Sequence, residues 1–322
     1  MSKRKLLVLA PIPPDLRSAL ALRYDLTDFD ASKAEIWRPF EIAITTGMTG
    51  AGLREFDACP DLKLVVSQGV GLDKIDLDAA RRRGIAVAHT PDEIAEDVGD
   101  AAIAMIYAAM RGVVHADAFV RAGRWGRERI APSRRIAGKT VGIVGLGRIG
   151  QHTAQRAQAI GMTVLYHSRA AKPGVTYPFV ATLDELAVRA DVLVLSCPGG
   201  KATHHLINKS ILEKLGPDGF LVNMSRGSVV DEAALLDALE AKSIAGAALD
   251  VFENEPNIDP RFFTLDNVVL APHSSSITRE TRAAIIARML GDIEAFLHGA
   301  PFFNAAEPLE SVGHRTGNRS YN

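Results

Sequence analysis

The chain has 322 residues, of which 47% are hydrophobic and 23% charged; this length suits two domains of roughly 100–200 residues, each with its own core. Its formal net charge of -1 argues against nucleic acid or an anionic membrane as the main partner. The only cysteines, Cys59 and Cys197, have no Cys or His at metal-ligand spacing, so we expect neither a metal site nor a disulfide framework.

Targeting signals are not evident in the sequence. No apolar stretch approaches the roughly 20 residues of a membrane-spanning helix. The N-terminal apolar run Leu6–Ala10 is too short for a signal sequence and is typical of a first β-strand. The low cysteine content suits a reducing compartment, and we expect a cytoplasmic protein. The polar, glycine-punctuated segment Ser311–Asn322 is predicted to be disordered.

Strand-like runs alternate with helical segments along nearly the whole chain. Many runs are continuously apolar, a pattern that fits parallel strands covered on both faces by helices. We therefore predict an α/β fold with right-handed crossover connections. The predicted strands are Lys5–Ala10, Glu41–Thr45, Leu62–Ser67, Ile85–Ala88, Thr140–Val144, Thr163–His167, Val192–Ser196, Phe220–Met224, Ala245–Val251 and Val268–Ala271.

A boundary is predicted in the first third of the chain. Thr90 is suited to cap a helix that has Pro91 in its first turn. The Ala-, Ile- and Met-rich stretch Ala101–Met110 predicts a long buried helix. A loop rich in Arg and Gly, Arg121–Gly138, follows, and the strand at Thr140 then opens a second sheet.

The sharpest local motif is G-x-G-x-x-G, formed by Gly145, Gly147 and Gly150 between an apolar strand and a helical stretch. Gly145 permits a tight turn, Gly147 lets the backbone approach a pyrophosphate, and Gly150 permits close helix–strand packing. The helix begins with Arg148 and Ile149, where free backbone N–H groups and a partial positive charge favour phosphate. The motif predicts a dinucleotide-binding site.

The end of the next strand bears on the choice of dinucleotide. NAD-specific sites place Asp or Glu there to accept from the ribose 2′-OH. This chain instead has Ser168 and Arg169, with Lys172 nearby and no acid before Asp184. Arg169 and Ser168 can grip a 2′-phosphate. One charged hydrogen bond is worth roughly 1.5–3 kcal/mol, so we predict NADP(H) favoured by about tenfold or more, with NAD(H) as the alternative.

Three polar residues in the second half each follow a predicted strand. They are Arg226, Glu255 and His273. Ligands of open parallel sheets bind at the carboxyl ends of strands, so these side chains can converge. A guanidinium can bind a carboxylate and polarise a carbonyl. A His can donate a proton as hydride arrives, and a neighbouring carboxylate favours its imidazolium form. The three residues predict reduction of a 2-keto acid.

These motifs together resemble those of the D-2-hydroxyacid dehydrogenase family, in particular its glyoxylate, hydroxypyruvate and hydroxyphenylpyruvate reductases. The matching segments are GLGRIG, NMSRGSVVDE, LDVFENEP and APHSSS, with VSQGVGLDKIDL and HTPDEIAEDVGDAA upstream. The resemblance implies that Arg226 anchors the substrate, and that His273 is the general acid/base with Glu255 as its partner. It also implies that the backbone N–H groups of Val70 and Gly71 bind the substrate carboxylate, since consecutive N–H groups can form an anion nest.

The resemblance places further residues near the cofactor. They are Val98, Cys197, Pro198, Asn223, Ser225, Asp250 and Ser275. Asp250 could equally orient a loop, and His204 and His205 are interpreted as structural residues at a helix start. The chain departs from the family at Gly69, where a small polar residue is usual, and at Gly99-Asp100, where Ala-Glu is common.

The implied architecture is two doubly wound parallel-sheet domains. A flavodoxin-like substrate domain would comprise residues 1–98 plus 289–322, and a Rossmann cofactor domain residues 99–288, with a homodimer formed through the cofactor domains. The substrate side chain is expected to meet Leu72 and Trp37–Phe40. The implied function is NADPH-preferring reduction of small 2-keto acids to D-2-hydroxy acids. Another dehydrogenase of the family and a non-enzymatic, dinucleotide-sensing regulator are the alternatives, and turnover would separate the regulator from an enzyme.

Overall fold

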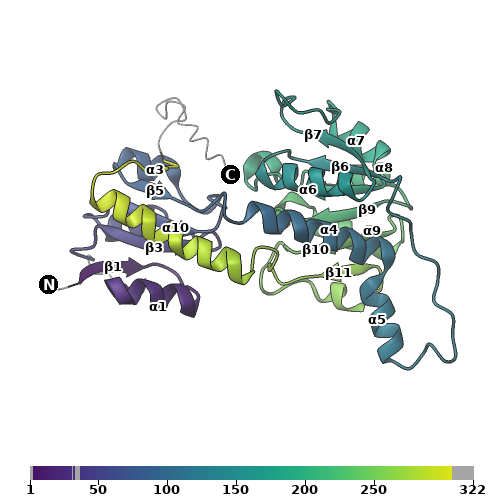
Figure 1. Ribbon diagram of the computed structural model, residues 1–322, viewed down its shortest axis with the longest axis horizontal. Coiled ribbons are helices and arrows are strands. Elements are labelled where there is room, and N and C mark those ends of the chain that lie inside the picture. The colour runs from purple at the N-terminus through teal and green to yellow at the C-terminus, as the bar shows by residue number, and fades with distance from the viewer. Residues whose placement is uncertain (1–2, 31, 33–36, 307–322) are drawn as a thin grey trace, which may run out of the picture. The chain divides into compact units, whose positions relative to one another are not determined.

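In the computed structural model the described residues are 3–30, 32 and 37–306, so the predicted disorder of Ser311–Asn322 lies outside them. The chain divides into two compact units: residues 1–93 with 279–322, and residues 94–278 (Figure 1). The predicted boundaries, after residues 98 and 288, fall inside two helices that each belong wholly to one unit. The chain passes between the units just before each of these helices begins, a position that apolar periodicity does not reveal.

The first unit contains a five-stranded parallel sheet in the order β2-β1-β3-β4-β5. This is the flavodoxin-like order, with its reversal between β1 and β3. The strands are β1 (Arg4–Val8), β2 (Tyr24–Asp28), β3 (Ile42–Thr46), β4 (Leu64–Gln68) and β5 (Ala86–Ala88). The helices are α1 (Pro14–Arg23), α2 (Leu53–Ala58), α3 (Leu77–Arg82) and α10 (Arg279–Leu297).

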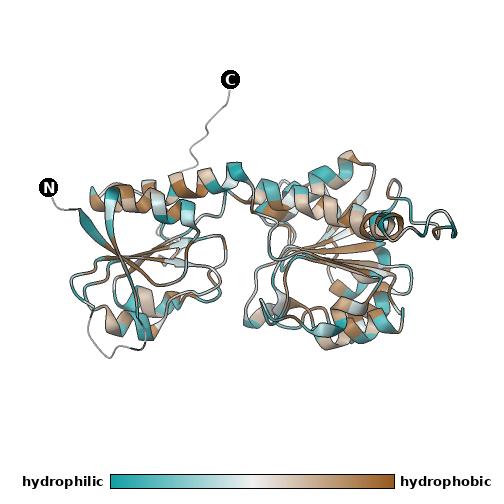
Figure 2. Ribbon diagram, turned by 90° about the horizontal axis from the view of Figure 1, so that it is seen from below, coloured by the Kyte–Doolittle hydropathy of each residue, from teal (hydrophilic) through white to brown (hydrophobic). Residues whose placement is uncertain are grey.

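Helices cover both faces of this sheet, because its central strands are apolar on both sides. On one face α2 and α3 bring Phe56 and Ala80 against strand residues such as Val65. On the other face Leu20 of α1 and Met289 of α10 are fully buried. Figure 2 shows the hydrophobic strands enclosed between the helices. The loops at the carboxyl ends of the strands are therefore left to carry polar chemistry.

The second unit contains a six-stranded parallel sheet in the order β11-β10-β9-β8-β6-β7. A single parallel bridge between Tyr166 and Phe179 adds one more position outside β7. With that bridge counted as a strand, the order around β6 is the 3-2-1-4-5-6 order of the Rossmann fold. The strands are β6 (Thr140–Val144), β7 (Thr163–His167), β8 (Val192–Leu195), β9 (Phe220–Asn223), β10 (Gly246–Leu249) and β11 (Val268–Leu270).

Two apolar clusters line the two faces of the second sheet. One cluster packs α4 and α6 on one face, and the other packs α7, α8 and α9 on the opposite face. The α-helices are α4 (Ala95–Arg111), α5 (Val113–Arg121), α6 (Arg148–Ala159), α7 (Leu183–Arg189), α8 (Lys209–Leu215) and α9 (Glu232–Glu240). Short 3-10 turns are η1 (Lys201–Thr203), η2 (Gly227–Val229) and η3 (Pro260–Thr264). Both units thus have the predicted doubly wound α/β architecture.

All ten predicted strands are present, with ends that shift by at most two residues. The prediction missed β2, whose sequence YDLTD has no apolar run. This strand lies at the edge of its sheet, where partial exposure removes the pressure for continuous hydrophobic residues.

The predicted helix start at Thr90 is wrong. Helix α4 begins at Ala95 without a side-chain cap, and Thr90 is fully buried in the first unit. Its hydroxyl instead accepts a hydrogen bond from the Gly69 N–H at 2.9 Å.

Among the described residues, no single helix is both long and apolar enough to cross a membrane. The pair α4 and α5 meets the length and composition criteria when taken together, but it is bent by 59°.

Candidate active site

The glycine motif lies at the reversal point of the second sheet, in the turn from β6 to α6. Gly145 has a φ of +93°, and a Cβ there would lie 2.7 Å from the Cα of Cys197 in the turn after β8. A Cβ on Gly150 would lie 2.2 Å from the Gly145 carbonyl oxygen. Both positions therefore require glycine for reasons internal to the fold.

Gly147 differs from its two neighbours in the motif. A Cβ there would have no heavy atom within 4 Å, and its φ of −78° suits any residue. Packing within the chain does not explain glycine at this position, whereas close approach of a ligand to the backbone of the turn does. The turn and the N-terminus of α6 therefore fit a pyrophosphate. Arg148, which is exposed, and half-buried Ile149 begin the helix there.

Ser168 and Arg169 follow β7 in an exposed turn. The Ser168 hydroxyl donates to the Ala170 carbonyl at 2.7 Å, and the Lys172 N–H donates to the buried Tyr166 hydroxyl at 2.8 Å. Arg169 is exposed and forms no hydrogen bond or ion pair with another described residue. The turn is thus ordered by its own contacts, and the Arg169 guanidinium remains available to bind a ligand.

Cys197 and Pro198 form the turn after β8, opposite the glycine turn. The Cys197 carbonyl accepts from the Ser225 hydroxyl, and Ser225 is itself buried. Burial raises the pKa of the Cys197 thiol, against the lowering effect of its Ser225 contact, so the thiol stays neutral. These residues shape the turn with neutral groups.

Arg226 is held by the turn between β9 and η2. Its guanidinium donates to the Ser225 carbonyl at 2.8 Å, and its own carbonyl accepts from the Asn223 side chain at 3.1 Å. A Cβ on Gly227 would lie 1.9 Å from the Phe252 carbonyl carbon, so the Arg226 turn lies directly against the segment after β10. This close approach brings a cation to the loop that carries Glu255.

Glu255 and His273 form a hydrogen-bonded pair. The Glu255 Oε2 is 2.7 Å from the His273 Nδ1, and the Glu255 Oε1 accepts from the Phe252 N–H at 2.8 Å. Burial raises the pKa of the Glu255 carboxyl, but these two hydrogen bonds and the charges of His273 and Arg226 outweigh it, and the net shift is downward. Glu255 is therefore an ionised partner for the imidazole.

Asp250 holds the loop that orients the His273 side chain. Its two carboxylate oxygens accept from the N–H groups of Ser274 and Ser275 at 2.8 and 3.1 Å, and the residue is 3% exposed. The His273 N–H donates to the Asp250 carbonyl at 2.9 Å, and His273 has a φ of 52°, an unusual value for a residue with a side chain. Of the two interpretations of Asp250, the loop-orienting one matches these contacts.

The loop after β4 in the first unit contains Gly69, Val70 and Gly71. Gly69 has a φ of 103°, which explains glycine where a polar residue is usual in the family. Thr90 holds the Gly69 N–H, and the His89 ring contacts the Val70 carbonyl at 3.1 Å. Within the described ranges, the N–H groups of Val70 and Gly71 donate to no other residue. These features suit an anion nest.

A second loop of the first unit contacts this nest and was missed by the sequence analysis. A Cβ on Gly47 would lie 3.0 Å from the Gly71 carbonyl oxygen, and the next residue, Met48, is half exposed. Trp37 and Phe40, which we expected near the substrate, are instead buried in the core of the first unit. The sequence WRPF did not reveal whether its two aromatic side chains line a pocket or pack in the core.

Val98 and Gly99 lie on the face of α4 that packs against α6. Val98 is 5% exposed and lies in the apolar cluster shared by α4 and α6. A Cβ on Gly99 would lie 2.8 Å from the Cβ of His152, so glycine lets α4 lie close to α6. Asp100 then pairs with Arg156 across these helices. The Gly99-Asp100 departure from the family pattern is therefore a feature of helix packing.

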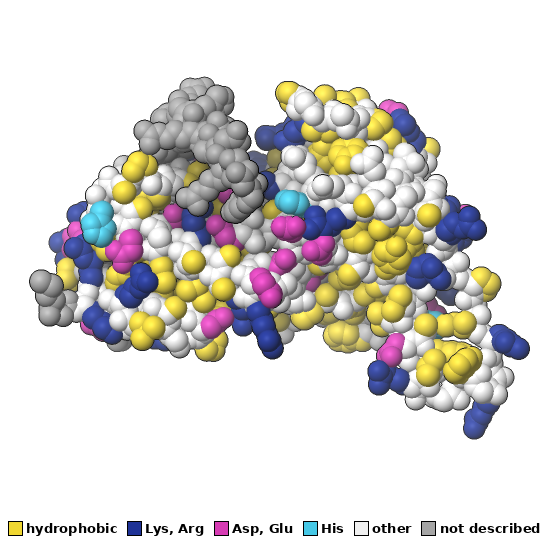
Figure 3. Space-filling model, in the orientation of Figure 1, with side chains coloured by type: hydrophobic (Ala, Val, Ile, Leu, Met, Phe, Trp, Pro, Cys, Tyr) yellow, Lys and Arg dark blue, Asp and Glu magenta, His cyan; other side chains and the backbone are white. Residues whose placement is uncertain are grey.

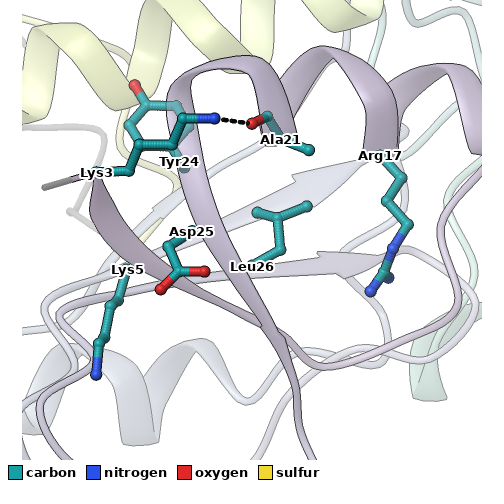
Figure 4. A pocket seen from close by; sticks show the side chains of 7 residues that line it. All are labelled: Lys3, Lys5, Arg17, Ala21, Tyr24, Asp25 and Leu26. Atoms are coloured by element: carbon teal, nitrogen blue, oxygen red, sulfur yellow. Dashed lines mark hydrogen bonds between the residues drawn. The ribbon is translucent and has the colours of Figure 1, made fainter.

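An open hollow on the first unit lies apart from these loops, beside the first residues of β1 and β2 (Figure 4). Its lining residues are Lys3, Lys5, Arg17, Ala21, Tyr24, Asp25 and Leu26. The Lys3 ammonium donates to the Ala21 carbonyl at 2.6 Å, and Arg17 is paired with Asp28. Two of its three cations already have partners, and we assign it no part in the chemistry.

In the second unit, a phosphate-binding turn follows β6, while an arginine and a carboxylate–histidine pair follow β9, β10 and β11. Parallel strands end at one edge of a sheet, so binding and proton-transfer groups share that edge. This combination defines a dehydrogenase that uses a nicotinamide dinucleotide.

Comparison with known proteins makes the class specific. Residues 103–275 match the family described as "D-isomer specific 2-hydroxyacid dehydrogenase, NAD binding domain", and the chain belongs to this family. It is 43% identical over 298 residues to 2-ketogluconate reductase of Gluconobacter oxydans, covering 92% of this chain and 96% of the relative. It is 39% identical over 299 residues to a glyoxylate/hydroxypyruvate reductase of Arabidopsis thaliana, covering 91% and 96% respectively.

Among solved structures, the chain is similar to the NADPH-dependent glyoxylate/hydroxypyruvate reductase of Sinorhizobium meliloti in complex with NADP and malonate. The TM-score is 0.89 at 36% identity, over 95% of this chain and 98% of that one. The protein is accordingly an NAD(P)-dependent 2-hydroxyacid dehydrogenase, which acts as a reductase of 2-keto acids.

Proposed function

We propose that this enzyme reduces small 2-keto acids of the glyoxylate and hydroxypyruvate type to D-2-hydroxy acids, with NADPH preferred over NADH. The observation that carries the proposal is the 2.7 Å contact between Glu255 and His273 on the same sheet edge as Arg226 and the glycine turn. The relatives named as glyoxylate/hydroxypyruvate reductases support the small substrate.

Each polar group has a role that its geometry suits. The Arg226 guanidinium binds the substrate carboxylate and polarises the keto oxygen. His273 uses its Nδ1 to contact Glu255, which leaves its Nε2 to donate the proton to that oxygen. A bound reduced nicotinamide supplies the hydride. In the first unit, the N–H groups of Val70 and Gly71 form a nest that also suits a carboxylate.

The dinucleotide would be held by the residues around the glycine turn. Gly145, Gly147, Gly150, Arg148 and Ile149 receive the pyrophosphate. The turns after β8, β9 and β10 and the loop after β11 border the nicotinamide, through Cys197, Pro198, Ser225, Asp250 and Ser275. Asp250 acts there by fixing the Ser275 backbone.

The NADPH preference rests on the turn after β7. Arg169 is exposed and lacks a described partner, so it can form a fork with a 2′-phosphate. Ser168 would have to exchange its hydrogen bond to Ala170 for one to the phosphate, so Arg169 carries most of the preference. The similarity to a reductase solved with NADP supports the same choice.

We also propose a homodimer formed through the second unit. Hydrophobic side chains gather over α4 and α5 on the face shown in Figure 3. Exposed members of this surface and of the following loop are Tyr107, Val113, Val114, Val120, Trp125 and Ile130. Monomeric proteins rarely expose so many large apolar side chains in one region, and a second copy of the chain would cover them.

The test is steady-state turnover with NADPH and with NADH, followed by the near-ultraviolet absorbance of the reduced nicotinamide. The substrates are glyoxylate, hydroxypyruvate, pyruvate and phenylpyruvate, with 2-ketogluconate included because of the relative that reduces it. We expect the highest kcat/KM with NADPH and glyoxylate or hydroxypyruvate. A higher value for 2-ketogluconate would replace the proposed substrate class with a sugar acid. NADPH binding without any turnover would favour the sensing regulator.

A further inference from the structure

A cluster of metal-ligating side chains lies outside the groups used above. His204 and His205 follow η1, and Glu253 lies in the segment after β10. One potential ligand atom from each lies within 4.8 Å of the other two. The His205 Nε2 is 3.1 Å from the Glu253 Oε1, and the two imidazole rings stack with centroids 3.9 Å apart.

The backbone holds both segments in place independently of any ligand. The His205 N–H donates to the Ser228 carbonyl at 2.8 Å, and His205 has a left-handed φ of 50°. The Glu253 N–H donates to the Glu232 carboxylate at 3.0 Å. The Gly227 backbone lies against the Phe252–Glu253 peptide, where a Cβ would not fit. The backbone at His205 and Glu253 is therefore held in place, which lowers the entropic cost of ordering these side chains around an ion.

The charge around the cluster favours a cation. The Glu232 carboxylate, which accepts from the Glu253 N–H, places a second acidic group beside the cluster. Arg261 is paired with Asp259 and Asp237. Glu232 and Glu253 thus bring two carboxylates close together, and a divalent ion would reduce their repulsion.

We propose that His204, His205 and Glu253 form a binding site for one divalent first-row transition metal ion, with water completing its coordination. Two imidazole nitrogens and a carboxylate oxygen suit zinc and its neighbours better than magnesium or calcium. Zinc–nitrogen and zinc–oxygen bonds of about 2.0–2.2 Å place tetrahedral ligand atoms roughly 3.3 Å apart. Side-chain rotation about exposed positions covers the difference from 4.8 Å.

The ion would join two segments that are about 50 residues apart in sequence. Glu253 precedes Glu255 by two residues, so the same segment carries the partner of His273. The site does not touch the reacting groups. Its effect is to cross-link the segment after β10 to the turn after η1. From the sequence the two histidines are interpreted as structural residues at a helix start, and Glu253 lies far from them along the chain.

The experiment uses the full chain without a histidine tag, stripped of metal by a chelator. Zinc chloride is titrated by calorimetry, and cobalt chloride by visible absorption, which reports nitrogen and oxygen ligands directly. We expect one ion per chain, together with a higher melting temperature in the presence of zinc. His204→Ala and Glu253→Gln should each abolish the tight site and the zinc-dependent rise in melting temperature.

Two controls separate this site from other imidazole–carboxylate pairs. His298 lies 3.8 Å from Glu294 without a second histidine, and His298→Ala should bind zinc as the natural chain does. His273→Ala should also retain the tight site, although it disturbs the active site. Unchanged binding in both His204→Ala and Glu253→Gln would overturn the proposal. So would loss of binding in His273→Ala alone, because that would place the ion at the active site.

Discussion

At the residue scale, the Glu255 carboxylate performs two functions: one oxygen fixes the Phe252 backbone and the other contacts His273. Glu255→Gln keeps the shape and removes the charge. We expect kcat/KM for keto-acid reduction to fall about 100-fold, within the range for general acid–base catalysis. An unchanged kcat/KM in Glu255→Gln would contradict this role.

The same carboxylate links stability to pH. Its pKa is lowered in the folded protein from an ordinary value of 4.5. An acid with a lowered pKa stabilises the fold above its unfolded pKa, and this stabilisation is lost as pH falls through the folded value. The stability advantage of the natural chain over Glu255→Gln should therefore be constant near neutrality and decrease below about pH 4.5. Urea denaturation at several pH values measures it.

Asp250 is the positioning residue whose role sequence alone left open. Asp250→Asn retains one acceptor oxygen and so leaves either the Ser274 or the Ser275 N–H without its acceptor in a partly buried place. We expect a loss of about 1–3 kcal/mol in the free energy of unfolding. We also expect a lower kcat with a smaller effect on the KM for keto acid, because His273 is misaligned while Arg226 is kept. The exposed Asp266→Asn is the matched control.

Arg169 determines the proposed choice of dinucleotide. Arg169→Asp removes the fork for a 2′-phosphate and adds an acceptor for a ribose hydroxyl. The ratio of kcat/KM with NADPH to that with NADH should fall about tenfold or more. Arg189→Asp makes the same charge change on α7 and should leave the ratio unchanged. If Arg169→Asp left it unchanged as well, the NADPH preference would not reside in this turn.

At the scale of elements, the glycine motif permits a matched pair of variants. Gly150→Ala places a methyl group against the Gly145 carbonyl, so it should destabilise the fold by about 1–3 kcal/mol. Gly147→Ala meets no atom within 4 Å and should change stability by less than about 0.5 kcal/mol. Both should weaken dinucleotide binding, measured by quenching of protein fluorescence. Normal dinucleotide affinity in Gly147→Ala would contradict close approach of the pyrophosphate.

The elements themselves were largely predictable from sequence. Buried parallel strands are continuously apolar, and this pattern located ten strands. It could not find β2, a polar edge strand, or the bridge at Phe179, which occupies a strand position with one residue. Their positions after predicted strands also singled out Arg226, Glu255 and His273 as candidates, and the structure pairs Glu255 with His273. It did not reveal that Thr90 fixes the Gly69 turn, because that contact joins residues 21 positions apart.

At the scale of the whole molecule, the apolar surface of α4, α5 and the following loop predicts self-association. The natural chain should elute with about twice the 34.5 kDa mass of one chain. Trp125→Asp and Val114→Asp, combined, should shift it toward the monomer, as measured by light scattering after gel filtration. Leu22 is 79% exposed on α1 of the first unit, and Leu22→Asp should leave the mass unchanged. A monomeric natural chain would refute the proposed dimer.

The first unit is built from two separate segments of the chain, residues 1–93 and 279–322, and this has a consequence for synthesis on the ribosome. The second unit is complete once Thr278 has been made, whereas the first lacks α10 until the end. Without α10, the face of the first sheet that buries Met289 and Ile293 is covered only by α1. Domains generally fold as units during translation. The segment that begins second can therefore finish folding first, while the nascent N-terminal segment waits for a helix encoded about 180 codons later.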